Sequence, residues 1–451
     1  MIKKGWYTVL LAMLFNTACT PVFSQSTRHV ILISIDGFHP DMYLDSGWPC
    51  PNLRYLIRRG TYADHLISTF PSYTYPSHTA MVTGAQPARS GIGFNQPIGS
   101  QGEWSWYAKA IKVPTLWDVL KKNGLSTAAI EWPATVGAPI TWNLPEIWRP
   151  GSVDRIGEAR KYATTGLIAE IEQNATGRLD SLNCDDDRLA LDQTLGLAAA
   201  YVFGFKRPAF MAVHFANVDS FEHREGRDGD SVRIALAGDD RAIGDILEAI
   251  KNSGEADSTA VIIVGDHGFA TIDTIMRPNR LIREVPARFI ASGGSAFLYS
   301  RSADKNGIIK AVTDSLNALP RGKRKLFRII DRKELDGMGA DSAALLALSA
   351  EPGMVFSASM GPAQAVSNGP GTFIQQNQLE GLFISTHGGH HGYDPNLPEM
   401  YTGFIAEGAG IARGGHIHSL REVDIAPLVA ALLGIDFKTP DGQKISGILS
   451  F

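Results

Sequence analysis

Four short apolar runs, each ending at polar residues, constrain the fold of this chain more than any other feature of its sequence. They are His29–Ile35, Thr127–Ile130, Phe210–Phe215 and Ala260–Val264. Uninterrupted apolar runs of this length are typical of strands buried on both faces of a parallel sheet. Three of the runs are followed within four residues by an aspartate, namely Asp36, Asp219 or Asp266. The pattern therefore predicts buried strands that deliver carboxylates at their C-terminal ends.

Helical patterns lie between these runs, at residues 53–59, 115–123 and 232–252. Strands that alternate with helices predict an α/β fold, a doubly wound and mostly parallel sheet flanked by helices. Ligands of such sheets bind beyond the carboxyl ends of the strands. We therefore expect the three aspartates to meet at one edge of the sheet.

A second, smaller unit is predicted between His267 and His391. Apolar stretches at 297–299 and 326–330 and a helical stretch at 308–316 indicate an α+β insertion at about residues 290–380. A strand at 401–406 and a helix at 424–433 then return to the main fold. We interpret residues 25–451 as one catalytic domain that carries this inserted subdomain.

The N-terminus has the pattern of an export signal. Lys3 and Lys4 precede the apolar segment Tyr7–Phe15, which is shorter than the ~20 residues that span a bilayer. We expect a cleaved signal peptide over residues 1–24, no transmembrane segment, and a periplasmic or secreted protein. Lipid attachment at Cys19 is the less favoured alternative, because Asn16-Thr17-Ala18 matches a lipoprotein cleavage box poorly.

Composition excludes some classes of partner. Of 451 residues, 44% are hydrophobic and 20% charged, as in an ordinary globular protein. The net charge of −4 gives no basic surface for nucleic-acid backbones, so any nucleotide should bind in a local pocket. Without the signal peptide, Cys50 and Cys184 remain, and the sequence leaves open whether they pair, as it leaves open the oligomeric state.

Five motifs along the chain supply Asp, His or hydroxyl groups. They are Ile35-Asp36-Gly37-Phe38, Ser72-Tyr73-Thr74-Tyr75-Pro76-Ser77-His78, Asp219-Ser-Phe-Glu-His223, Gly265-Asp266-His267-Gly268 and Gly389-His390-His391-Gly392-Tyr393. Three Asp and two or more His, gathered in space, can hold two divalent cations around one hydroxyl. The sequence thus indicates phosphoryl transfer at a two-metal site.

In this order the motifs resemble the nucleotide pyrophosphatase/phosphodiesterase family (type I phosphodiesterases) of the alkaline phosphatase superfamily. The resemblance runs from about Val30 to the C-terminus. It implies an alkaline phosphatase-like fold and a zinc-dependent phosphoric diester hydrolase that acts on a small phosphodiester such as a nucleotide. It also implies that hydrolysis proceeds through a phosphothreonine.

Thr74 is the predicted nucleophile. Pro76 suits the first position of a helix that Gly84 could end, and a helix N-terminus favours a phosphate. Ser72 is the rival hydroxyl, but the family's nucleophile directly precedes an aromatic-Pro pair. The alternative is a purely structural role for Thr74, as a helix cap.

The metal ligands follow from the resemblance. Asp36, Thr74, Asp266 and His267 are assigned to one cation, and Asp219, His223 and His391 to the other. Asp219 and His223 would share one face of a helical turn. Mixed carboxylate and imidazole ligands favour two zinc ions, with manganese or iron as alternatives.

Two assignments depend most on the resemblance. The family's third histidine precedes Gly-Tyr-Asp, which selects His391 over its neighbours His387 and His390. Asn95 matches the family's asparagine that donates a hydrogen bond to a non-bridging phosphate oxygen, a form of oxyanion stabilisation. A loop asparagine with no catalytic role is the alternative.

The same residues argue against some related reactions. The Ser72–His78 motif lacks the Cys/Ser-x-Pro-x-Arg setting of sulfatases, and the stretch 131–137 lacks the Lys-x-Arg pair of related monoesterases. A phosphomonoesterase or phosphonate hydrolase is the alternative enzyme, and a metal-stabilised binding protein the alternative class. The Tyr75 side chain is expected either to stack on a nucleobase or to pack in the core under the helix.

Overall fold

The computed structural model describes residues 27–100, 102–148, 154–185, 188–360 and 381–450. The predicted signal peptide, with Cys19, and residues 361–380 of the predicted insertion lie outside these ranges. In the part of the chain that is described, no helix has the length and apolar character needed to cross a membrane.

The larger sheet has eight strands and is mostly parallel. Its order is β17 (Gly415–Arg421), β2 (Thr61–Ile67), β16 (Phe404–Gly408), β6 (Thr259–Gly265), β1 (His29–Ile35), β5 (Phe210–Phe215), β3 (Thr127–Ile130) and β4 (Trp142–Leu144). Central β1 pairs in parallel with β5 and β6, while β16 runs antiparallel to both of its neighbours. The predicted fold class, a mostly parallel sheet flanked by helices, is confirmed.

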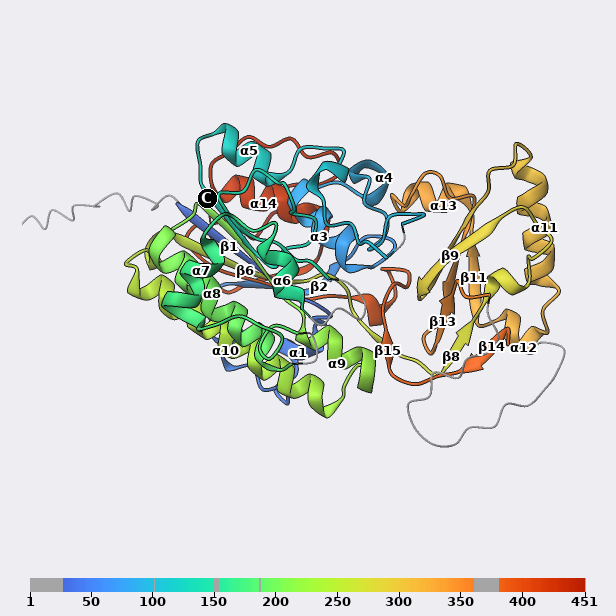
Figure 1. Ribbon diagram of the computed structural model, residues 1–451, viewed down its shortest axis with the longest axis horizontal. Coiled ribbons are helices and arrows are strands. Elements are labelled where there is room, and N and C mark those ends of the chain that lie inside the picture. The colour runs from blue at the N-terminus through green and yellow to red at the C-terminus, as the bar shows by residue number, and fades with distance from the viewer. Residues whose placement is uncertain (1–26, 101, 149–153, 186–187, 361–380, 451) are drawn as a thin grey trace, which may run out of the picture.

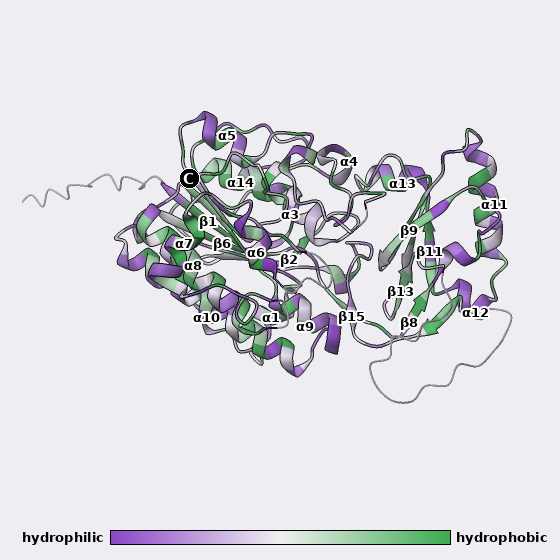
Figure 2. Ribbon diagram, in the orientation of Figure 1, coloured by the Kyte–Doolittle hydropathy of each residue, from purple (hydrophilic) through white to green (hydrophobic). Residues whose placement is uncertain are grey.

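Side chains of β1 alternate between two hydrophobic cores, as the period of a strand requires. Ile31 and Ile33 belong to the core under α2, α8 and α10, whereas Val30 and Leu32 belong to the core under α3, α5 and α14. These two groups of helices cover opposite faces of the sheet in Figure 1, and the strands between them are mostly hydrophobic in Figure 2. Burial on both faces explains the uninterrupted apolar sequence of β1.

The helices of this main lobe have the following bounds: α1 (Asp41–Leu44), α2 (Pro51–Arg59), α3 (Thr74–Thr83), α4 (Pro87–Ser90), α5 (Leu116–Lys122), α6 (Arg155–Arg160), α7 (Leu167–Ile171), α8 (Ala190–Lys206), α9 (Asn217–Glu225), α10 (Asp230–Asn252) and α14 (Ile425–Leu432). α8 and α10 pack against each other over β5. α9, which begins just after β5, lies at the edge where the carboxyl ends of the strands meet.

A second sheet forms the smaller lobe on the right of Figure 1. Its strand order is β11 (Phe327–Ile330), β12 (Ala347–Ala350), β10 (Ser295–Tyr299), β9 (Arg288–Gly293), β13 (Met354–Ser357), β8 (Thr274–Met276) and β14 (Phe383–Ser385). Helices α11 (Lys305–Asn317), α12 (Arg321–Arg324) and α13 (Arg332–Gly337) accompany it. The sheet starts before residue 290 and ends after residue 380, so it is wider than the predicted insertion.

Two segments of the predicted site form a separate two-stranded sheet beside this smaller lobe. β7 (Ala270–Thr271), just after His267, pairs with β15 (Gly389–His390), just before His391. Tyr393 and Met400 are buried in the hydrophobic core of the smaller lobe. The insertion therefore helps to fix the position of His391.

Cys50 and Cys184 are both buried and unpaired with each other. The Cys50 thiol donates instead to the carbonyl oxygen of Met42 at 3.0 Å. The pairing that the sequence left open is not formed in this structure.

Candidate active site

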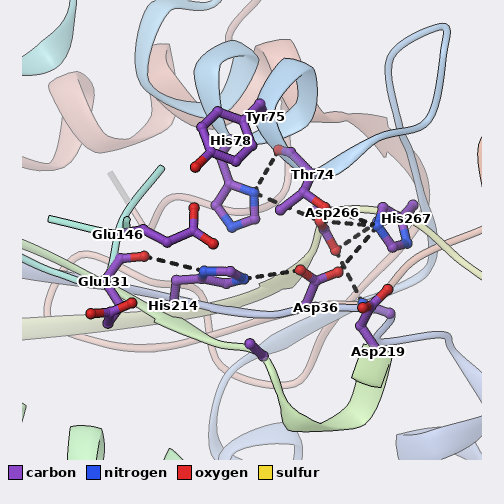
Figure 3. Close-up of polar contacts among 12 residues, drawn as sticks. Asp36, Thr74, Tyr75, His78, Glu131, Glu146, His214, Asp219, Asp266 and His267 are labelled. Atoms are coloured by element: carbon purple, nitrogen blue, oxygen red, sulfur yellow. Dashed lines mark hydrogen bonds and ion pairs between the residues drawn. The ribbon is translucent and has the colours of Figure 1, made fainter. Parts of the chain in front are cut away.

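The carboxyl ends of β1 and β6 bring Asp36, Asp266 and His267 together (Figure 3). Nε2 of His267 lies 3.1 Å from Oδ1 of Asp36 and 3.3 Å from Oδ2 of Asp266. The other Asp266 oxygen, Oδ1, accepts hydrogen bonds from the backbone N–H groups of Gly37 at 3.1 Å and His267 at 3.0 Å. Asp266 is thus oriented by the backbone with one oxygen left to face Asp36.

A second group of side chains adjoins the first. Asp219 and His223 lie one turn apart on α9, with His223 Nε2 3.3 Å from Asp219 Oδ1. Nε2 of His391 lies 3.7 Å from the same oxygen, and the His391 ring stacks on His267 with centroids 3.6 Å apart. All six predicted Asp and His ligands are therefore brought together around one centre.

The imidazoles of His223 and His391 are oriented by backbone carbonyls. Nδ1 of His223 donates to the Gly389 oxygen at 3.1 Å, and Nδ1 of His391 to the Ser72 oxygen at 3.0 Å. In its neutral form each ring then has an unprotonated Nε2 on the Asp219 side. This arrangement is common for metal-binding histidines.

The donor set fits divalent cations. Asp36 Oδ1, Asp219 Oδ1 and Asp266 Oδ2 are buried and lack hydrogen-bond partners within the described structure. Buried oxygens of this kind are costly unless a cation or a donor meets them. Burial and the charge of Asp36 also raise the pKa of Asp266 well above its ordinary value. The adjacent oxygen and imidazole donors could therefore hold metal ions.

Thr74 is the first residue of α3 and lies beside this centre (Figure 3). Its Oγ1 lies 3.5 Å from His267 Nε2. Gly84 ends the helix in a left-handed conformation, φ 63°, as predicted. Pro76 is the third residue of the helix rather than the first, because the chain already turns helical at Thr74 after the extended Tyr73.

Ser72, the rival hydroxyl, points elsewhere. Its side chain is fully buried, and Oγ donates to the carbonyl oxygen of Tyr393 at 3.0 Å. A hydroxyl held in this way tethers the Tyr393 segment to the loop before α3. The geometry therefore favours Thr74 as the reactive hydroxyl.

Asn95 lies beside the start of α3. Its Oδ1 accepts a hydrogen bond from the backbone N–H of Tyr75 at 3.0 Å, so the side-chain NH₂ is left to donate. Asn95 is half-buried, and its own carbonyl accepts from Ser105 N–H at 2.8 Å. The side chain is therefore well placed to present donors near the Thr74 hydroxyl.

The Tyr75 side chain packs in the core and offers no free surface for stacking. Its ring is fully buried and meets Trp104 edge-on, with centroids 5.4 Å apart and an interplanar angle of 71°. Burial, followed by the charge of Glu146, raises the Tyr75 pKa well above its ordinary value. The sequence could not decide between the two interpretations because position in a chain does not fix the direction of a side chain.

A buried polar network behind Asp36 was not predicted from the sequence. Nε2 of His214, on β5, lies 3.1 Å from Asp36 Oδ2, and Nδ1 lies 3.2 Å from the Glu131 carbonyl oxygen. Burial lowers the pKa of His214, but the hydrogen bond and charge of Asp36 outweigh it and raise the value to about 9. Arg155 pairs with the Glu131 carboxylate at 2.7 Å. The available signal was a single histidine within an otherwise apolar run.

Comparisons with known proteins identify the family of this chain. The family model described as type I phosphodiesterase / nucleotide pyrophosphatase matches residues 30–394. An uncharacterized pyrophosphatase/phosphodiesterase of Schizosaccharomyces pombe is 28% identical over 278 residues, which cover 59% of this chain and 48% of that relative. A bis(5'-adenosyl)-triphosphatase of Xenopus laevis is 23% identical over 440 residues, which cover 95% of this chain and 81% of that relative.

Solved structures show the same fold. Murine ectonucleotide pyrophosphatase/phosphodiesterase 5 superposes with a TM-score of 0.66 at 18% identity, covering 92% of this chain and 97% of that one. An inactive threonine-to-alanine variant of that protein, in complex with AMP, superposes with a TM-score of 0.64 at 17% identity, over the same shares of both chains.

Proposed function

Because the chain belongs to the type I phosphodiesterase / nucleotide pyrophosphatase family, we propose that it is an exported, metal-dependent hydrolase of small nucleotide phosphodiesters or pyrophosphates. The observation that carries the proposal is the position of Thr74 Oγ1, at the start of α3 and 3.5 Å from His267 Nε2. A helix N-terminus attracts phosphate, and the neighbouring carboxylates and imidazoles suit cations.

Asp36, Thr74, Asp266 and His267 would hold one cation, and Asp219, His223 and His391 the other. Two bound divalent cations, preferably zinc, would activate the hydroxyl and offset negative charge on the attacking and leaving oxygens. Asn95 would donate its side-chain N–H groups to a non-bridging phosphate oxygen. Such a donor stabilises charge that grows in the transition state.

The reaction proceeds in two displacements. Thr74 Oγ1 loses its proton and forms a bond to phosphorus, while the bond from phosphorus to the leaving oxygen breaks. The leaving group departs with that electron pair and takes up a proton. Water then attacks the phosphothreonine, and the bond between phosphorus and Thr74 Oγ1 breaks. The products are a nucleoside monophosphate, the second product and the regenerated threonine.

Two observations favour a nucleotide diester as the substrate. The relatives are named for nucleotide pyrophosphates and phosphodiesters, and one structural neighbour was solved with AMP. A dianionic monoester would call for added fixed cations, yet the stretch 131–137 contains no Lys or Arg. Arg155, which packs against this stretch, is paired with Glu131 and Glu146.

Two substrates with one leaving group test the proposal. The p-nitrophenyl ester of a nucleoside monophosphate and p-nitrophenyl phosphate should be compared for kcat/KM, before and after chelation and with zinc restored. We expect the diester to be preferred, nucleoside monophosphate to be released, and chelation to abolish turnover. A preference for the monoester would indicate a phosphatase, and no turnover of either ester by the zinc-loaded protein would indicate a binding protein.

Export is tested separately. The mature protein should be recovered outside the cytoplasm, and its N-terminal sequence should begin near residue 25. Recovery in the cytoplasm with Met1 retained would contradict this part of the proposal without affecting the chemistry.

A further inference from the structure

His214 contacts Asp36 from the side opposite the candidate metal ligands (Figure 3). It lies on the central strand β5, opposite Ser34 of β1, and its side chain is 1% exposed. The other residues of β5 are apolar and buried. A histidine in such a strand is costly to bury unless both ring nitrogens find partners.

Both ring nitrogens of His214 have acceptors as partners. Nδ1 faces the backbone carbonyl oxygen of Glu131 at 3.2 Å, and a carbonyl oxygen can only accept. Nε2 faces Asp36 Oδ2 at 3.1 Å, on a carboxylate that the site needs ionised. The ring therefore has a hydrogen-bond acceptor at each end and cannot turn over without losing one of the two contacts.

Because of this contact, the two Asp36 oxygens have different partners. Oδ2 is taken by His214, whereas Oδ1 is buried without a hydrogen-bond partner and lies 3.1 Å from His267 Nε2. Asp36 is thus set to offer one oxygen, in one direction, to the group formed with Asp266 and His267. Fixing a ligand before the metal arrives removes an ordering cost from binding.

The carbonyl that holds His214 is itself fixed. Glu131 has a left-handed backbone, φ 55°, which is unfavourable for a residue that carries a side chain. Its buried carboxylate accepts from Arg155 Nε at 3.1 Å and from Nη2 at 2.7 Å. The ion pair restrains Glu131 in a conformation that points its carbonyl oxygen at Nδ1 of His214.

We infer that His214 is a positioning residue: it holds Asp36 so that one carboxylate oxygen is directed at the metal, and the Glu131–Arg155 pair supports it. The inference rests on the proposed function, because it assumes that Asp36 binds a metal. His214 is not itself one of the candidate ligands, and its expected effect is on the affinity of the site for metal.

Two amide substitutions separate the two hydrogen bonds. His214→Gln can place a donor near the position of Nε2 and so keep the contact with Asp36. His214→Asn can reach only the position of Nδ1 and so keeps the contact with Glu131. We expect His214→Asn to lower the affinity for one of two zinc ions by about 10–100-fold, as loss of an outer partner of a ligand does, and His214→Gln to lower it much less.

The readout is zinc binding, measured by titration against a competing chelator and by metal content after gel filtration. His29→Asn is the matched control, since His29 is another buried histidine, at the far end of β1, with Nδ1 2.8 Å from the Pro208 carbonyl oxygen. It should leave zinc binding unchanged. His214→Leu repeats the loss without burying a new amide, in case the Asn variant does not fold.

Wild-type zinc affinity in both His214→Asn and His214→Leu would overturn the inference, as would equal losses in the Gln and Asn variants. Failure of the proposed function would look different. In that case the wild-type protein would bind zinc, with His214 still affecting the affinity, yet would cleave neither ester.

Discussion

Nδ1 of His391 donates to the backbone carbonyl oxygen of Ser72 at 3.0 Å, which ties the last histidine motif to the loop that carries Thr74. The two segments are more than three hundred residues apart in sequence, so this contact brings the hydroxyl and the imidazole into one site. It also fixes the tautomer, because the donating Nδ1 leaves Nε2 unprotonated and able to bind a metal.

The neighbouring His390 also lies beside His223, but its Nδ1 makes the opposite kind of hydrogen bond, and this leads to the first prediction. Nδ1 of His390 accepts from the His391 backbone N–H at 3.0 Å, so a neutral His390 carries its proton on Nε2. We therefore expect His391→Ala to lose one zinc ion per chain and at least about 100-fold in kcat/KM. His390→Ala should keep both ions. The reverse result, measured by metal content and turnover, would move the assignment by one residue.

The second prediction concerns two hydroxyl groups, that of Ser72 just before α3 and that of Thr74, the first residue of α3. Thr74→Ala should fold and still bind zinc through the remaining ligands, but lose roughly 10³-fold or more in kcat, because the attacking oxygen is absent. Thr74→Ser should retain appreciable activity and form a phosphoserine that can be trapped at low pH and located by mass spectrometry.

Ser72→Ala is the control for this pair. It removes the hydrogen bond to Tyr393, which should lower the free energy of unfolding by about 1 kcal/mol while leaving most of the turnover. An inactive Ser72→Ala together with an active Thr74→Ala would reverse the assignment of the nucleophile.

The third prediction uses the contact between Asn95 and Tyr75. Asn95→Asp keeps an oxygen to accept from the Tyr75 N–H but removes the side-chain donors and adds a negative charge. We expect a loss of about 10²–10³-fold in kcat, with little change in melting temperature, because the cap of α3 is retained. Asn95→Ala should lose both activity and some stability. Equal activity in Asn95→Asp and the wild-type protein would show that Asn95 only caps the helix.

The strands of the large sheet were predictable where they are buried on both faces. β1 spans His29–Ile35, as its apolar run predicts, and β5 and β6 match their runs closely. The edge strand β17 and its neighbour β2 were not predicted. Their sequences mix apolar with charged and polar residues because one face of each is only partly covered.

The candidate site was predictable where residues come in motifs that follow strands. Asp36 and Asp266 lie where a parallel sheet must place them, and the spacing of Asp219 and His223 is that of the helical turn observed in α9. His214 and Arg155 could not be predicted in this way. Their roles depend on which distant segment each side chain meets, and that information arises only from the packing of β3, β5 and α6.

The last prediction concerns a buried pair of carboxyls that anchors α9. Asp192 on α8 accepts from the backbone N–H groups of Ala216 at 3.0 Å and Asn217 at 2.6 Å, at the start of the helix that carries Asp219. Asp239 on α10 packs against Asp192. Burial, followed by the charge of Asp192, raises the pKa of Asp239 well above its ordinary value.

The folded protein should therefore keep Asp239 protonated where the unfolded chain has already released that proton. Between the ordinary value of 3.8 and the raised folded pKa, the folded state binds more protons, so the free energy of unfolding falls as pH rises. The loss is at most about 1.4 kcal/mol per pH unit within that window. Asp239→Asn cannot ionise, yet its amide can still donate to Asp192, so the variant should lack this loss. Urea unfolding of metal-free protein should show similar stabilities near pH 4 and an advantage for Asp239→Asn that grows toward pH 8. Glu248→Gln, at an exposed position of the same helix, should follow the wild-type curve. An Asp239→Asn curve parallel to that of the wild type would contradict the expectation that Asp239 stays protonated in the folded protein.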